Sequence, residues 1–241
     1  MKYYILSLLL IGSLAAQAQD FETDTFQTSA GELTITFIGH GSLMMEWDGK
    51  IIHVDPSTRE ADYTKLPDAD LILITHHHGD HCDAEAVDAI TKNDTRIVLT
   101  ALAREVLESG DVLPIGDNTD FGPVNISAMP AYNLVHKRDN GDFYHPNGCC
   151  NSYLIEGGDM RIFIGGDTEN TPEMKALENV DIAFLPMNLP YTMTPEMVAD
   201  AAMGFRPAIL YPYHYGSTDP QELVALLKNE SDIEIRIRKM P

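Results

Sequence analysis

Positive charge is scarce in this chain, which has 16 Lys and Arg residues against 37 Asp and Glu residues and a formal net charge of −21 at pH 7. Binding to phosphate backbones needs a basic surface, so we expect no nucleic-acid partner. An anionic membrane surface is disfavoured for the same reason. The hydrophobic fraction of 44% is nevertheless enough to build a packed core, so we do not expect a disordered chain.

Cysteine is also scarce, with only Cys82, Cys149 and Cys150. Because the number is odd, at least one thiol has no disulfide partner within the chain. Buried, unmodified thiols are the default expectation. A disulfide from Cys82 to Cys149 or to Cys150 is an alternative, and so is thiolate ligation of a metal.

Long apolar runs are absent except at the start of the chain. Residues 3–14 are almost wholly apolar, follow Lys2, and precede the small-residue motif Ala16-Gln17-Ala18, which is typical of a cleaved signal peptide. The run is shorter than the roughly 20 residues that span a bilayer, so a membrane anchor is the weaker alternative. We therefore expect a signal peptide at 1–18, a single domain at 19–241 without a membrane span, and a periplasmic or secreted location.

Short β-rich runs alternate with helical patterns along the rest of the chain. We expect strands at 33–38, 43–47, 51–54, 71–74, 96–99, 124–129, 152–156, 161–164, 181–185, 208–211 and 233–237, and helices at 84–91, 101–108, 172–178, 195–203 and 220–228. Proline opens three of these helices behind the expected N-caps Thr171, Thr194 and Asp219. This order predicts an α/β or α+β sandwich. The long irregular segment 131–151 is of the kind that is usually functional.

One histidine-rich run contains most of the chemical information. The apolar strand 71–74 is followed by Thr-His-His-His-Gly-Asp-His-Cys-Asp. Alternation along extended backbone points His76 and His78 to one side and His77 away from them, and Asp80 and His81 follow at a glycine-assisted bend. Imidazole and carboxylate groups are common ligands of zinc. A solvated histidine-rich turn is the alternative, but the density of these groups at the end of a strand favours a metal site.

The His-x-His-x-Asp-His motif resembles that of the metallo-β-lactamase superfamily, which implies a four-layered αββα sandwich. Three further matches occur in the family's order. Asp55 ends an early strand, where the family keeps an aspartate that supports the ligand loop. Asp167 lies in Gly-Gly-Asp-Thr, which is similar to the family's motif for the carboxylate that bridges two metals. His214 in Tyr-His-Tyr-Gly matches the last histidine ligand. The resemblance extends from about Leu33 to Lys228.

The resemblance leaves two candidates for the third histidine of the first metal site, His136 and His145. His145-Pro146-Asn147-Gly148 is similar to a motif in a branch that includes predicted metal-dependent hydrolases and L-ascorbate-6-phosphate-lactonase-like proteins, which favours His145. Many relatives place a histidine where this chain has Asn133, so Asn133 is expected to face the substrate or to support a ligand.

The resemblance thus implies two divalent metal ions. The implied ligands are His76, His78 and His145 for one ion, Asp80, His81 and His214 for the other, and Asp167 between them. Zinc is the favoured metal, and manganese or iron would also suit these groups. Such a pair can lower the pKa of a shared water enough to supply hydroxide near neutral pH. Asp80 or Asp167 would then act catalytically by carrying a proton to the leaving group.

The sequence does not distinguish hydrolysis of an ester, lactone, amide or phosphodiester bond. We expect a small-molecule or lipid-like substrate, with His40 contacting it or supporting a ligand. Tyr191 is expected either to bind an oxyanion or to pack at the rim of the site. Two alternatives remain open, an iron-dependent redox enzyme on the same fold and a metal-binding protein without catalysis. The physiological substrate and the oligomeric state are not predicted.

Overall fold

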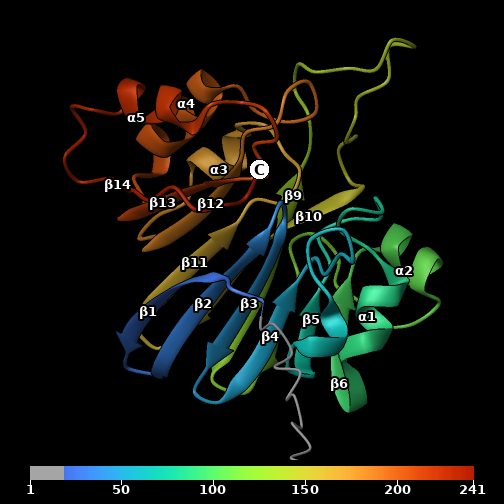
Figure 1. The fold of residues 1–241 in the computed structure, drawn as a ribbon. Helices are drawn as coiled ribbons and strands as arrows, with labels where there is room; N and C mark the ends of the chain where they lie inside the picture. The colour runs from blue at the N-terminus through green and yellow to red at the C-terminus, as the bar shows by residue number, and fades with distance from the viewer. Residues whose placement is uncertain (1–18) are drawn as a thin grey trace, which may run out of the picture.

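Two seven-stranded sheets pack face to face in the computed structural model, which describes residues 19–241 (Figure 1). The proposed signal peptide at 1–18 lies outside the described residues. Helices cover the outer face of each sheet, with α1 and α2 against the first and α3, α4 and α5 against the second (Figure 1). The expected αββα sandwich of the metallo-β-lactamase fold is therefore confirmed.

The first sheet has the strand order β1-β2-β3-β4-β5-β6-β7. Its elements and the short helices that cover it are β1 (Glu22–Thr28), β2 (Gly31–Gly39), β3 (Ser42–Trp47), β4 (Lys50–Val54), β5 (Ala69–Leu73), β6 (Thr91–Leu99), β7 (Asp111–Val112), the 3₁₀ turn η1 (Tyr63–Lys65), α1 (Ala84–Ile90) and α2 (Ala101–Leu107). Strands β1 to β4 pair antiparallel, and β4 to β7 pair parallel. Asp48 and Gly49 both have positive φ at the β3–β4 turn, as a two-residue hairpin of this kind requires.

The second sheet has the order β14-β13-β12-β11-β10-β9-β8. Its elements and helices are β8 (Asn118–Phe121), β9 (Val124–Ala131), β10 (Cys150–Gly157), β11 (Met160–Ile164), α3 (Pro172–Lys175), β12 (Ile182–Pro186), α4 (Pro195–Phe205), β13 (Ile209–Tyr213), α5 (Pro220–Leu226) and β14 (Glu234–Ile235). The N-caps of α3, α4 and α5 are Thr171, Thr194 and Asp219, as the sequence predicts.

The main hydrophobic core lies between the two sheets. The rings of Phe184 and Tyr211 from the second sheet stack with centroids 5.0 Å apart, and Phe37 from the first sheet packs 4.9 Å from Tyr211. Trp47 is fully buried in the same layer. Two further clusters fill the space between each sheet and its helices. Burial of this much apolar surface on both faces of each sheet fixes the layer order.

Several features differ from the sequence-based expectations, among them the short strands β7 and β8, which were not expected. Strand β1 was not expected, because its sequence is mostly polar and its antiparallel position at a sheet edge leaves four of its seven residues exposed. The last strand is shorter than expected, since β14 contains only Glu234 and Ile235. The predictions for the cysteines are partly wrong, because the adjacent residues Cys149 and Cys150 form a disulfide with each other, while Cys82 is the buried thiol.

Candidate metal centre

Every segment of the candidate site follows the carboxyl end of a strand. His40 follows β2, Asp55 follows β4, the histidine-rich run follows β5, Asp167 follows β11 and His214 follows β13. These strands run in the same direction within their sheets, so their carboxyl ends meet at one edge of the sandwich. The same edge of α/β proteins commonly binds ligands. The irregular segment between β9 and β10, drawn as the long loop at the upper right of Figure 1, also begins here.

One group of side chains is formed by His76, His78, His145 and Asp167. Each offers a ligand atom, and these atoms all lie within 4.8 Å of one another. His78 Nδ1 is 3.0 Å from His76 Nε2 and 3.3 Å from His145 Nε2. Asp167 Oδ2 is 3.2 Å from His145 Nε2 and 3.8 Å from His76 Nε2. We call these four residues the first cluster.

A second group is formed by His40, Asp80, His81 and His214, whose ligand atoms also lie within 4.8 Å of one another. Asp80 Oδ2 is 3.4 Å from His40 Nε2 and 3.9 Å from His214 Nε2. We call these residues the second cluster. Asp167 connects the two clusters, because its Oδ1 atom lies 3.4 Å from both His81 Nε2 and His214 Nε2 while its Oδ2 atom faces the first cluster.

Unsatisfied polar atoms indicate that these groups can hold metal ions. His81 Nε2, His214 Nε2 and Asp167 Oδ1 are buried and lack a hydrogen-bond partner among residues 19–241. Buried polar atoms are almost always hydrogen-bonded in folded proteins, so orphaned atoms that converge need a further partner. Imidazole nitrogens and carboxylate oxygens are suitable donors for a divalent cation. The donor set therefore fits the metal ions that the fold implies.

The electrostatics of the clusters agree with this fit. Burial lowers the pKa of His78 and of His214 to about 4 and holds the pKa of His76 well below its ordinary value. These imidazoles are therefore neutral near pH 7, as metal ligands must be. His81 behaves differently: burial opposes its charged form, but the carboxylates of Asp167 and Asp55 raise its pKa to about 9. The buried carboxylates thus attract positive charge to the cluster.

Asp55 orients His81 through Nδ1, the ring nitrogen that faces away from the cluster. The Asp55 carboxylate is fully buried and accepts a hydrogen bond from His81 Nδ1 at 2.8 Å, which leaves His81 Nε2 facing the cluster. The backbone N–H and the hydroxyl of Thr75 also donate to Asp55, at 2.7 and 2.6 Å. Because the Thr75 hydroxyl is used in this way, its oxygen accepts from His76 Nδ1 at 3.1 Å and turns Nε2 of that ring inward.

Asn133 orients His145 in the same manner. Asn133 Oδ1 accepts from the backbone N–H of His145 at 2.7 Å and from its Nδ1 at 3.0 Å, so Nε2 points to the first cluster. The amide nitrogen of Asn133 donates to Glu169 and to the carbonyl of Tyr191. Asn133 is buried, and its side-chain contacts are with the proposed ligand His145, with Glu169 and with Tyr191.

His136 does not join either cluster. Its Nδ1 atom lies 2.8 Å from Glu169 Oε1, and the Glu169 carboxylate also accepts from three consecutive backbone N–H groups at residues 134–136. Glu169 is fully buried, and these hydrogen bonds hold residues 134–136 at the start of the irregular segment. Sequence reasoning missed Glu169, because no local pattern around this carboxylate indicates that it will accept from backbone N–H groups 33–35 residues away.

His40 belongs to the second cluster itself, whereas the expectation was that it contacts the substrate or supports a ligand. Its ring is 3.6 Å from that of His214 by centroid distance, and its Nδ1 atom contacts the carbonyl oxygen of Pro241 at 2.7 Å. His40 has a positive φ of 50°, a conformation that usually persists only where surrounding contacts fix it. Gly41 allows the close approach, since a Cβ there would lie 2.7 Å from His81 Cε1. His77 belongs to neither cluster.

A cavity of about 520 Å³ opens beside both clusters. His78 and His145 line it from the first cluster, and His40, Asp80 and His214 line it from the second. Asp167 is the shared side chain at its base. Tyr191 also lines this cavity and is 44% exposed, with its ring edge-on to Tyr144 at 5.0 Å. This volume can hold a small organic molecule next to the proposed metal ligands.

The fold and the paired clusters define a metal-dependent hydrolase of the metallo-β-lactamase fold. The chain belongs to the β-lactamase superfamily domain family, whose model matches residues 34–214. It is similar to a UPF0173 metal-dependent hydrolase from Geobacillus thermodenitrificans, at 30% identity over 81% of this chain and 93% of that protein. A UPF0173 metal-dependent hydrolase from Methanopyrus kandleri is 27% identical over 79% of this chain and 87% of its own length.

A crystal structure of a proposed metal-dependent hydrolase from Parabacteroides distasonis is also similar. It is 49% identical, covers 92% of this chain and 100% of its own, and has a TM-score of 0.88. The similarity therefore extends over the whole sandwich.

The comparisons correct one prediction, the periplasmic or secreted location. The predicted location is wrong, because the relatives are UPF0173 metal-dependent hydrolases of archaea and Geobacillus and give no support for export. That prediction rested on residues 1–18 alone, whereas the similarity to these relatives extends over most of the described chain. In residues 19–241, no helix has the length and apolar character required to cross a membrane.

Proposed function

We propose that the chain hydrolyses an ester, lactone, amide or phosphodiester bond of a small-molecule or lipid-like substrate with two divalent metal ions, zinc being the favoured metal. The central observation is the position of Asp167, whose two carboxylate oxygens face separate histidine clusters. We assign His76, His78 and His145 to one ion and Asp80, His81 and His214 to the other, with Asp167 shared. His40 completes the second cluster.

Bound metal ions of this kind would supply Lewis-acid stabilisation of negative charge and a water that is acidic enough to attack near neutral pH. The chain's own contribution is to hold the ligands in place. Asp55 and Asn133 each fix one imidazole through its Nδ1 atom, so that Nε2 faces the cluster without rotating. Burial of the imidazoles keeps water from competing for these nitrogens.

Asp80 is the proposed proton carrier. Its side chain is 29% exposed and lines the cavity, whereas the side chain of Asp167 is only 5% exposed. Although burial opposes it, the hydrogen bond from His40 and the nearby His81 hold the pKa of Asp80 well below its usual range. Asp80 is therefore a carboxylate at neutral pH, and its Oδ2 atom can accept a proton and pass it to the leaving group. Asp167 is the alternative carrier, but it faces four imidazoles and has less access to a substrate.

We also propose that residues 19–241 act as one hydrolase domain. Support comes from the core between the sheets, which contains buried side chains from both halves of the chain, including Trp47 and Phe184. The proposed ligands likewise come from both sheets.

Metal analysis of the purified protein, combined with turnover of ester, lactone, amide and phosphodiester substrates, tests this proposal. We expect about two metal ions per chain and turnover of at least one substrate class, both strongly reduced in His76→Ala and Asp167→Asn. The matched control is His77→Ala, which removes an adjacent imidazole that lies outside both clusters. Full metal content without turnover of any class would favour a non-catalytic metal-binding protein. A visible absorption spectrum from bound iron with redox activity would favour the oxidoreductase alternative.

A further inference from the structure

Two arginines line the same cavity as the proposed metal ligands. Arg59 follows β4 in sequence and lies beside Gly79, and Arg138 belongs to the irregular segment between β9 and β10. Both are exposed, and neither forms an ion pair with a carboxylate in residues 19–241. The proposed metal centre and two guanidinium groups without an acidic partner therefore border one space of about 520 Å³.

Most arginines of this chain have an acidic partner, as is expected of a chain with 37 acidic residues and 16 basic ones. Five of the other arginines in residues 19–241 are paired, among them Arg161 with Glu156 and Arg206 with Glu230 and Asp232, whereas Arg104 on α2 is not. A surplus of carboxylates makes an ion pair easy to form at most surface positions. In residues 19–241, no carboxylate pairs with the guanidinium groups of Arg59 and Arg138, which remain available to an anionic ligand.

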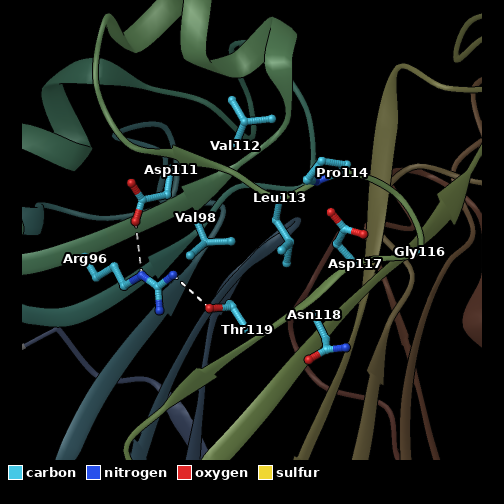
Figure 2. Close-up of a pocket in the computed structure, with 10 residues that line it drawn as sticks. All are labelled: Arg96, Val98, Asp111, Val112, Leu113, Pro114, Gly116, Asp117, Asn118 and Thr119. Carbon is cyan, nitrogen blue, oxygen red and sulfur yellow. Dashed lines mark hydrogen bonds and ion pairs between the residues drawn. The ribbon is translucent and has the colours of Figure 1, made fainter.

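A second cavity, of about 330 Å³, provides a direct contrast (Figure 2). Arg96 lines it, but its guanidinium donates to Asp111 Oδ2 at 3.2 Å, to the Thr119 hydroxyl at 2.8 Å and to the Asp120 carbonyl at 2.9 Å. Its hydrogen-bonding capacity is therefore used within the protein. Arg96 ties neighbouring segments together and leaves little capacity for a ligand.

The position of Arg138 is fixed by local structure. Its backbone N–H donates to Asp142 and its carbonyl accepts from Gly141, so residues 138–142 form a tight turn. The guanidinium lies 5.0 Å from the centre of the Tyr144 ring and donates to the Tyr144 carbonyl at 3.4 Å. Tyr144 in turn contacts Tyr191 across the cavity wall. The lining of the cavity thus combines aromatic side chains with the two arginines and the proposed metal ligands.

We infer that the substrate has a carboxylate or phosphate group, separate from the bond that is cleaved, and that Arg59 and Arg138 bind this group. The planar guanidinium fork binds both oxyanions through paired, charge-assisted hydrogen bonds. The inference rests on the proposed function, because it takes the metal clusters as the place where the bond is cleaved. Arg59 and Arg138 would determine specificity without contacting the reacting atoms.

The test compares two esters with the metal-loaded protein. 4-Nitrophenyl hemisuccinate has a free carboxylate, and 4-nitrophenyl butyrate is a neutral ester of similar length. We expect Arg59→Ala and Arg138→Ala each to lower kcat/KM for the hemisuccinate about tenfold, mainly through KM, because a charge-assisted hydrogen bond is lost. The value for the butyrate should change less than about twofold, since truncating an exposed side chain has little effect on the fold.

Arg104→Ala is the matched control, because it removes an exposed arginine of α2 that lines neither cavity. It should leave both esters unaffected. Equal losses for both esters in the cavity variants, or no loss for either, would overturn the inference.

Calorimetric titration separates this inference from the proposed function, because it needs no turnover. Succinate and glycerol 3-phosphate are the probes for carboxylate and phosphate. We expect the metal-loaded protein to bind one of them at least about tenfold more tightly than the Arg59→Ala/Arg138→Ala variant does. If wild-type protein cleaves neither ester but this difference is present, the bond class in the proposed function is wrong and the anion site stands. If both probes bind wild type and variant equally, the anion site is wrong.

Discussion

The two clusters of the metal centre are built in different ways. In the first cluster, His76 and His78 come from one extended segment, and His145 is held by Asn133 from a segment pinned by Glu169. In the second cluster, His40 and His214 both have positive φ, and the His214 N–H donates to the His40 carbonyl. The first cluster depends on side-chain alternation, and the second depends on strained backbone that other contacts must maintain.

The clusters also differ in charge and exposure. The first cluster has three imidazoles and only the carboxylate of Asp167, while the second has its own carboxylate, Asp80, in addition to Asp167. Asp80 is open to the cavity, and the first-cluster residues His76 and His145 are almost completely buried. We therefore expect the first cluster chiefly to bind its ion and the second to combine ion binding with proton transfer.

The largest effect is expected from Asp167→Asn, because this carboxylate is the one group common to both clusters. An amide removes the charge at the same size, so both ions should bind more weakly and turnover should fall roughly 10³-fold, since several kcal/mol of charge stabilisation is lost. Metal content and kcat/KM measure the two effects. Loss of only one ion would show that Asp167 serves a single cluster.

His145→Ala should affect the first cluster alone, with the loss of one metal equivalent and retention of the other. His136→Ala is its counterpart in the same segment, and should keep both ions while lowering the free energy of unfolding by about 1–3 kcal/mol, because the buried Glu169 loses a hydrogen-bond partner. Metal analysis and denaturant unfolding distinguish these results. The opposite pattern would make His136 the ligand.

Asp55→Asn and Asn133→Ala test the supporting residues of the two clusters. Removal of a group that orients a metal-binding histidine typically costs 10–100-fold in metal affinity. We expect Asn133→Ala to weaken the first ion and Asp55→Asn to weaken mainly the second, each by about that factor. Asp55→Asn should have a smaller effect on the first ion, through Thr75 and His76. Competition with a chelator measures each affinity. Equal weakening of both ions by either variant would contradict the separation of the clusters.

Asp24→Asn should have the smallest effect. Asp24 pairs with Arg236 and Arg238, in the segment that ends at the Pro241 carbonyl on His40. Burial opposes ionisation, but the hydrogen bonds from Arg238, Tyr211 and Arg236 lower the pKa of Asp24. Its folded-state pKa is thus below its unfolded value. The stabilisation is fully present above the unfolded pKa of about 3.9 and is lost as the pH falls through the lower folded pKa.

For such a partly exposed pair, we expect Asp24→Asn to cost about 0.5–1 kcal/mol near pH 7 and nothing once the wild-type carboxyl is protonated. Thermal unfolding as a function of pH measures this difference. Affinity for the second ion should fall slightly, and that of the first should not change. A larger effect on the first ion would show that the C-terminal segment supports the whole centre.

Much of the fold could be predicted because hydrophobic periodicity and capping are local signals. The runs around Leu71 and Phe184 become buried strands, and Thr194 caps α4 as expected. Strand β1 could not be predicted in this way, because its polar residues are stabilised only by pairing with β2. The bond between Cys149 and Cys150 was likewise not anticipated, since cysteine counting does not give connectivity.

The sequence by itself determined the chemical types at the centre and their order, because a dense His-x-His-x-Asp-His motif, a Gly-Asp-Thr motif and a late histidine have few other uses. Only the tertiary structure decided which atoms converge: it set His145 against Asp167 and His136 against Glu169, and brought His40 beside Asp80. The physical reason is that strand ends distant in the chain meet only after two sheets have packed on a shared core, and no local pattern encodes the distances between them.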